Sequence, residues 1–260
     1  MSDNKESAKS TRQKAAEARA TAQAAERRRE RMIRIVGGLA VLVVVVGIIA
    51  IGITQRGGKS ASTDTPSADS PLPTGISADN GYGFQVSTAA NKPDVVIFED
   101  FQCPACASFE QTYGPAIQEL AAAGDIALTY RIMTFLDNNL QTDHSSRAAS
   151  AFGCSIDAGA GEAYHNTIYA NQPQTEGAGW TDDQLKTFGT DAGITGEAKT
   201  TFDTCVDEGT YKGWAGLSNQ AAFDSGVTGT PTIEVNGEKI PDGALANEQA
   251  LREALTNPAQ

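Results

Sequence analysis

Basic residues are scarce over most of this 260-residue chain. Residues 60–260 contain 8 Lys or Arg against 27 Asp or Glu, a net charge of −19, whereas residues 1–59 carry +7. Because a nucleic-acid-binding protein needs a basic face, the acidic part of the chain argues against that class of partner. Cysteine is absent before residue 103. An N-terminus lipid-modified at a cysteine is therefore not expected.

The longest apolar run covers residues 35–53, nineteen uncharged positions that would extend ~28 Å as a helix. This length fits one transmembrane helix. Ten Lys or Arg precede the run, whereas only Arg56 and Lys59 follow it closely. The positive-inside rule therefore predicts a single-pass cell-membrane protein with a cytoplasmic N-terminus and an extracytoplasmic C-terminal part. A cleaved signal peptide is the alternative, but its apolar centre usually covers only about 7–15 residues.

Composition divides the rest of the chain into three parts. Residues 1–34 form a basic tail without an apolar stripe, which predicts a solvated helix or a disordered segment in the cytoplasm. Residues 54–80 are rich in Gly, Ser, Thr, Asp and Pro, as is typical of a linker. Residues 81–260 are long enough for one domain with its own hydrophobic core.

The segment Cys103-Pro104-Ala105-Cys106 follows an apolar, strand-like run and precedes a helix-like stretch. The first backbone N–H groups of a helix lack partners within it and carry the positive end of its dipole, so they stabilise a thiolate. A cysteine in this position commonly has a pKa well below that of a free thiol. We therefore predict that Cys103 is a redox nucleophile and that Cys106 is its buried resolving partner.

All four cysteines follow the apolar run, on the predicted outer side of the membrane, where no cytosolic thiol pool keeps them reduced. Four cysteines allow three pairings, and the proximity of Cys103 to Cys106 leaves Cys154 to pair with Cys205. We expect the second pair to be a structural disulfide. A second redox-active pair, or a zinc site, is the alternative.

Periodicity predicts an alternating α/β pattern. Strands are expected at residues 82–87, 95–101 and 126–133, with a helix at 109–123 that makes a right-handed parallel crossover between the last two. From about residue 138 to 225 the pattern is helical. Two further strands follow, at 230–235 and 238–240, joined by the hairpin signal Asn236-Gly237, and a final helix is expected at 247–255.

Three features together resemble the DsbA-like branch of the thioredoxin superfamily, in particular its membrane-anchored actinobacterial members: residues 98–106, the helical insertion, and Gly229-Thr230-Pro231-Thr232. The resemblance covers roughly residues 82–258. It implies an α/β, thioredoxin-like fold with a helical insertion. It also implies an enzyme without a bound cofactor that introduces disulfides into unfolded exported proteins and is reoxidised by a membrane partner similar to DsbB or VKOR. A disulfide isomerase or reductase, and a non-catalytic peptide-binding module, are the alternatives.

The resemblance further implies a cis Thr230–Pro231 bond beside the thiols, with Thr230 and Pro231 binding an extended substrate peptide. A trans proline at the start of an edge strand is the alternative. Relatives often carry a buried acid six residues before the first cysteine, where this chain has Ile97. Glu99, on the same strand face, is the candidate substitute for proton transfer; alternatively, Glu99 and Asp100 are solvated.

The sequence places no histidine close to the cysteine pair. Ala105 stands where strongly oxidising relatives have histidine, so the resemblance implies a milder oxidant. His144 and His165 lie far from the cysteine pair in sequence. For both histidines we expect surface or packing roles, and we predict no metal site.

Overall fold

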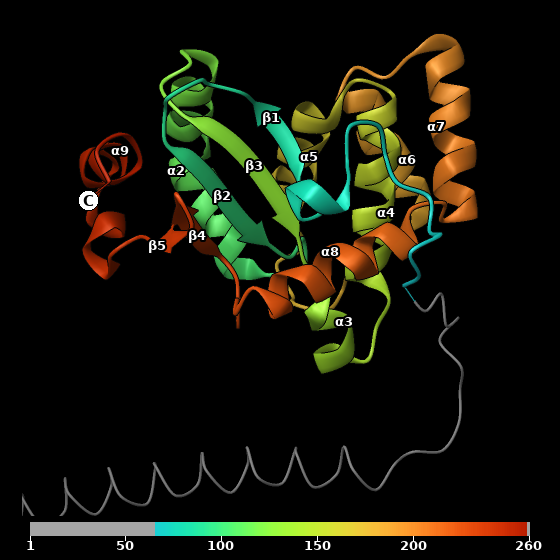
Figure 1. Cartoon of the computed structure of the whole chain (residues 1–260). Coiled ribbons are helices and arrows are strands. Elements are labelled where there is room, and N and C mark those ends of the chain that lie inside the picture. Colours follow the sequence, from blue (N-terminus) through green and yellow to red (C-terminus); the bar gives the residue numbers. More distant parts are fainter. Residues whose placement is uncertain (1–65, 259–260) are drawn as a thin grey trace, which may run out of the picture. The chain divides into compact units, whose positions relative to one another are not determined.

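A computed structural model describes residues 66–258 of the chain (Figure 1). The predicted basic tail and the predicted transmembrane helix at residues 35–53 lie outside the described residues. Within residues 66–258, no helix combines the length and the apolar character that crossing a bilayer requires.

A five-stranded mixed sheet forms the centre of the domain, in the order β1-β3-β2-β4-β5. Its strands are β1 (Phe84–Ser87), β2 (Asp94–Glu99), β3 (Ala127–Ile132), β4 (Thr232–Val235) and β5 (Glu238–Lys239). β2 and β3 are parallel, and the other neighbouring pairs are antiparallel. The predicted parallel crossover and the predicted hairpin at Asn236-Gly237 are therefore confirmed. Both hairpin residues have positive φ, 54° and 82°, which this two-residue turn requires.

One helix of the domain joins β2 to β3, six lie in the insertion, and one follows β5. They are α2 (Pro104–Ala122), α3 (Phe135–Leu140), α4 (His144–Asp157), α5 (Gly161–Ala170), α6 (Asp182–Asp191), α7 (Gly196–Glu208), α8 (Lys212–Asp224) and α9 (Glu248–Thr256). Figure 1 shows α4 to α7 grouped at one side of the sheet and α9 at the other. The thioredoxin-like fold with a helical insertion is thus confirmed, and α3 is the insertion helix that the sequence pattern did not indicate.

Side chains of β2 point alternately to the two faces of the sheet. Val95 and Ile97 belong to the main hydrophobic core, which also contains residues of α2 and α5. Phe98 packs instead with Met133, Ala222 and Val227 in a separate cluster on the other face. By this alternation, Glu99 belongs to the face that α2 and α5 cover.

The predicted linker at 54–80 is described from residue 66 onwards, and there it is held against the domain. The backbone N–H and the hydroxyl of Thr74 both donate to Oδ1 of Asp157 in α4, at 2.8 Å. Ile76 is buried in the main core. Residues 66–80 are thus attached to the domain through one buried apolar side chain and one hydrogen-bonded threonine.

A disulfide joins Cys154 in α4 to Cys205 in α7, with 5.9 Å between their Cα atoms. This is the pairing expected from the sequence. It ties together two helices of the insertion that are 51 residues apart in the chain.

Candidate active site

Cys103 lies immediately before α2, as the N-cap residue, and Pro104 occupies the first helical position. Proline fits there because that position needs no backbone N–H donor. Cys103 and Cys106 are both free thiols. Cys103 is 8% exposed and Cys106 is fully buried, so only the first sulfur faces the surface. The predicted positions of both cysteines, at the start of the helix and one turn inside it, are therefore correct.

The environment of Cys103 favours its thiolate. A hydrogen bond from the Cys106 thiol is the largest cause that lowers the pKa of Cys103, to about 6, although burial opposes the shift. The Thr230 hydroxyl and the backbone N–H groups of Cys106 and Ala105 lower this pKa further. At neutral pH Cys103 is therefore mostly ionised. Ala105 contributes through its backbone, although its side chain offers no donor.

Cys106 has the opposite preference. Burial raises its pKa most, and the hydrogen bond to Cys103 and the negative charge of Glu99 raise it further. Cys106 therefore keeps its proton until an acceptor inside the protein removes it.

The Thr230–Pro231 peptide bond is cis, and the alternative of a trans proline is wrong. It directly precedes β4, which pairs with β2. When Cys103 is protonated, its Sγ donates a hydrogen bond to the carbonyl oxygen of Thr230, at 3.5 Å. Within the described residues, Oγ1 of Thr230 is buried without a hydrogen-bond partner. It is free to donate to the Cys103 thiolate.

Asp100 supports the turn that carries the cysteines. It is fully buried, and its Oδ1 accepts hydrogen bonds from the backbone N–H of Gln102 at 2.9 Å and from Oγ of Ser145 at 2.6 Å. Its Oδ2 accepts from the backbone N–H of Leu136. The alternative of a solvated Asp100 is therefore wrong: this acid connects the turn to α3 and α4.

A second set of polar contacts comes from Gln172, in the turn that follows α5. Nε2 of Gln172 donates to the carbonyl oxygens of Phe101, at 2.7 Å, and of Cys103, at 3.0 Å. The insertion thus fixes the backbone on both sides of Gln102. Nothing in the sequence pattern pointed to Gln172, because the contact joins segments about 70 residues apart.

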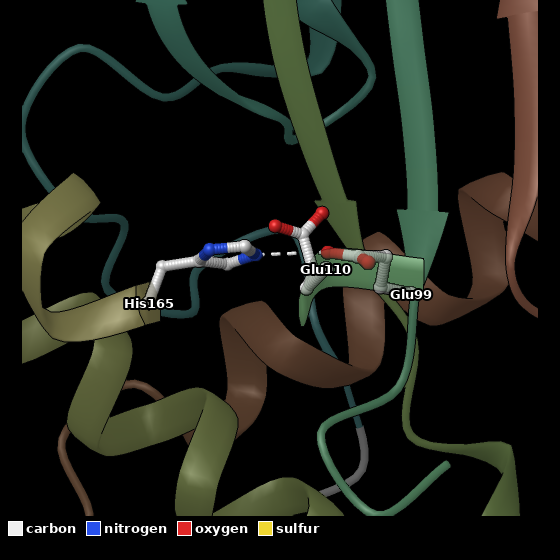
Figure 2. Close-up of side chains that lie close together, drawn as sticks. All are labelled: Glu99, Glu110 and His165. Carbon is white, nitrogen blue, oxygen red and sulfur yellow. Dashed lines mark hydrogen bonds and ion pairs between the residues drawn. The ribbon is translucent and has the colours of Figure 1, made fainter. Parts of the chain in front are cut away.

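Glu99, Glu110 and His165 form a buried cluster (Figure 2). Nε2 of His165 lies 2.8 Å from Oε2 of Glu99, and both side chains are completely buried. One polar atom of each of the three side chains lies within 4.8 Å of the others. The surface role considered for His165 and the solvated alternative for Glu99 are wrong, whereas His165 does pack among buried aromatic rings.

Burial disfavours every charge in this cluster. It raises the pKa of Glu99 well above its usual range, raises the pKa of Glu110 to about 8, and lowers the pKa of His165. The negative charge of Glu99 adds to the shift at Glu110. Two carboxyl groups and one imidazole so close together also resemble a metal-ligand set. The Nε2 atom that would bind a metal is, however, already engaged by Glu99.

Comparison with known proteins identifies the family to which this chain belongs. The family model described as Thioredoxin matches residues 87–256. The chain belongs to the thioredoxin family. No curated protein matches its sequence significantly.

Several solved structures are similar to this thioredoxin-family chain. MdbA, a thiol-disulfide oxidoreductase from Actinomyces oris, is 23% identical, with a TM-score of 0.60 over 73% of this chain and 90% of MdbA. Oxidised DsbA from Mycobacterium tuberculosis is 26% identical, with a TM-score of 0.55 over 68% and 94%. BdbD from Bacillus subtilis is 22% identical, with a TM-score of 0.58 over 72% and 97%. The resemblance to DsbA-like proteins is thus confirmed.

Proposed function

We propose that this chain is an extracytoplasmic thiol-disulfide oxidoreductase that introduces disulfides into exported proteins through Cys103 and Cys106. The observation that carries the proposal is the pairing of an ionised Cys103 with a protonated, buried Cys106 at the start of α2. The similarity to DsbA of Mycobacterium tuberculosis and to MdbA of Actinomyces oris supports the same class of chemistry.

The reaction transfers two electrons from a substrate dithiol to the Cys103–Cys106 disulfide. A substrate thiolate attacks Sγ of Cys103, so that a substrate–Cys103 disulfide forms, the Cys103–Cys106 bond breaks, and Cys106 leaves as a thiolate that takes up a proton. A second substrate thiolate then attacks the substrate sulfur of the mixed disulfide and expels Cys103 as a thiolate. The substrate leaves oxidised and the enzyme is left reduced. In this scheme Glu99 is the proton-transfer group for Cys106.

The direction of the reaction follows from the acidity of Cys103. A lowered thiol pKa stabilises the reduced enzyme, and a protein whose reduced form is stabilised oxidises other dithiols. The largest cause of the low pKa, the Cys106 thiol, exists only in the reduced enzyme. This favours an oxidase over a reductase or isomerase on the same scaffold.

Thr230 and Pro231 are proposed as the substrate-binding edge. The Thr230 carbonyl lies within hydrogen-bond reach of Cys103, so a peptide whose sulfur reaches Cys103 must pass along this backbone. The Cys154–Cys205 disulfide is proposed as a structural link within the insertion. Residues 35–53 are proposed as the membrane anchor, which would hold the domain near a reoxidising membrane protein similar to DsbB or VKOR.

The test is to trap substrates with a Cys106→Ala variant of the full chain expressed in its membrane. Mixed disulfides cannot then be resolved by the enzyme's second thiol, and mass spectrometry identifies the captured proteins. We expect exported proteins with paired cysteines, and no capture by Cys103→Ser. A Cys103→Ser chain that keeps its cellular role would overturn the proposal in favour of a binding module. A reduction potential near that of thioredoxin, about −270 mV, would favour a reductase.

A further inference from the structure

The proton at Cys106 needs a route that the thiols alone do not provide. Cys106 is fully buried, so bulk water does not reach its sulfur. In the proposed reaction this sulfur gains a proton when substrate is oxidised, and loses it when the enzyme is reoxidised. Groups inside the protein must therefore exchange that proton.

Three titratable side chains lie on the face of the sheet that α2 covers, the face on which Cys106 is also buried. Glu110 follows Cys106 by four residues in α2, so the two side chains lie one above the other on the same buried face. Glu99 ends β2, close enough for its charge to act on Cys106. His165, from α5, bonds to Glu99 (Figure 2). The cluster thus joins the resolving thiol to a helix of the insertion.

The far side of the cluster opens into a cleft of about 220 Å³ between α2 and α5. Glu110, Gln118, Asn166 and Tyr169 are among the residues that line it. Glu110 is 7% exposed, whereas Glu99 and His165 have no exposed surface. Oδ1 of Asn166 lies 3.3 Å from Nδ1 of His165. The carboxyl group of Glu110 therefore borders this cleft, and Nδ1 of His165 is connected to it through Asn166.

We propose that Glu99, Glu110 and His165 form a proton relay between Cys106 and the cleft between α2 and α5. The proposal rests on the proposed function, because it assigns a route to the proton that the dithiol reaction moves. When Cys106 leaves as a thiolate, the relay delivers one proton to its sulfur and regains one from solvent through Glu110. When the enzyme is reoxidised by a disulfide-bearing partner, Glu99 releases its own proton to solvent through Glu110 and accepts the proton of Cys106. The Cys106 sulfur then displaces the partner's thiolate from Cys103.

Other titratable groups also face the cluster: Cys103 at the start of α2, Asp100 after β2, Tyr130 in β3, and Glu162 and Tyr169 in α5. Burial raises the pKa values of both tyrosines well above their usual range, so they stay protonated. The tyrosines enclose the relay: Tyr130 stacks on His165 with ring centroids 4.1 Å apart, and Tyr169 meets it edge-on. Proton exchange near neutral pH is thereby left to the acids and the imidazole.

In the part of the chain that the structure describes, the packing around Glu110 leaves one oxygen of its carboxyl group without a hydrogen-bond partner. Within the described residues, Oε1 of Glu99 and Oε1 of Glu110 are buried without a hydrogen-bond partner. A Cβ at Gly114, one turn after Glu110, would lie 2.5 Å from Oε2 of Glu110, so a glycine is needed for the carboxyl group to occupy this position. The unpaired oxygen of each acid can accept or release a proton without breaking a hydrogen bond of the fold.

The experiment separates the two chemical steps in the reduced, full chain. Glutathione disulfide is mixed with the protein, the reaction is quenched with acid, and mass spectrometry counts the Cys103–glutathione mixed disulfide and the Cys103–Cys106 disulfide over time. Formation of the mixed disulfide depends on Cys103 and tests the proposed function. Its resolution requires loss of the Cys106 proton and tests the relay.

Glu99→Gln, Glu110→Gln and His165→Gln should form the mixed disulfide at the wild-type rate, within about twofold. Near neutral pH they should resolve it at least about tenfold more slowly, since general acid–base catalysis commonly contributes about 10²–10⁴-fold. The deficit should shrink as pH rises, because hydroxide that enters during brief local opening of the site then removes the proton. Glu119→Gln, an exposed acid in the same helix that pairs with Arg252, is the matched control and should behave as wild type.

Two results would overturn the relay. Resolution within twofold of wild type in all three variants would show that Cys106 exchanges its proton elsewhere. A deficit that is equal at every pH would show that the cluster only supports the fold. If the mixed disulfide does not form even in the wild-type chain, the proposed function fails instead.

Discussion

Nε2 of His165 lies 2.8 Å from Oε2 of Glu99, across 66 residues of sequence. Glu99 ends the strand that leads to Cys103, and His165 belongs to a helix of the insertion. The insertion is therefore bonded to the core of the redox site, and its role extends beyond covering one side of the sheet. Gln172, which holds the carbonyl of Cys103, makes a second connection of the same kind.

Replacing Thr230 by Val should raise the pKa of Cys103 above about 6, because the variant loses the hydroxyl that favours the thiolate. One hydrogen bond contributes about 1 kcal/mol net, which corresponds to about a fivefold change in the thiolate–thiol equilibrium. The rate of alkylation by iodoacetamide against pH measures the shift. Thr228→Val, at an exposed position two residues earlier, is the control. Identical profiles for the two variants would exclude a contribution of the Thr230 hydroxyl.

Stability should fall as pH rises through the range in which Glu110 titrates. Burial raises the folded-state pKa of Glu110 to about 8, so the folded chain holds this proton more tightly than the unfolded chain does. The resulting stability is complete below the unfolded-state pKa and is lost as pH rises through about 8. Glu99 and Asp100, whose pKa values are also raised by burial, act in the same direction.

Urea unfolding of the oxidised protein measures this effect, since Cys103 does not titrate in a disulfide. Between pH 6.5 and 8, Glu110→Gln should lose about 1–2 kcal/mol less unfolding free energy than wild type, because the titration of unfolded His165 is the same in both proteins and cancels. Equal losses in the two proteins would show that Glu110 titrates normally.

Removing the second disulfide should affect stability and leave thiol chemistry intact. Cys154 and Cys205 are 51 residues apart, and closing a loop of this size stabilises a fold by roughly 2–4 kcal/mol. The double variant Cys154→Ala, Cys205→Ala should therefore unfold at lower urea while it oxidises a dithiol peptide at the wild-type rate. Loss of oxidation at unchanged stability would instead identify this pair as a redox relay.

Local signals in the sequence were sufficient for much of the fold. The strand before Cys103, the helix after it and the Asn236-Gly237 hairpin each rest on a short pattern, and each was found where it was predicted. The Cys154–Cys205 pairing followed because the CxxC motif left no other partner. These features depend on residues that are close together in the chain, or, for the disulfide, on the number of cysteines that remain.

The relay cluster depends on tertiary contacts, and the sequence did not predict it as a unit. Glu110 carried a usable signal, because it lies four residues after Cys106 on the face of α2 that must be buried. His165 carried none, since its pairing with Glu99 arises only when α5 packs beside α2. Helix α3 was missed because six residues are too few for a clear helical period.

The ionisation of Cys103 is the central claim, and a pH titration of the reduced full chain tests it most directly. The ultraviolet absorbance of the thiolate, with Cys103→Ser as the blank, should give a titration midpoint at about pH 6. In Cys106→Ala the midpoint should move upward, because the strongest hydrogen bond to the thiolate is lost. A midpoint near 8.5, the ordinary value for a cysteine, would contradict the account.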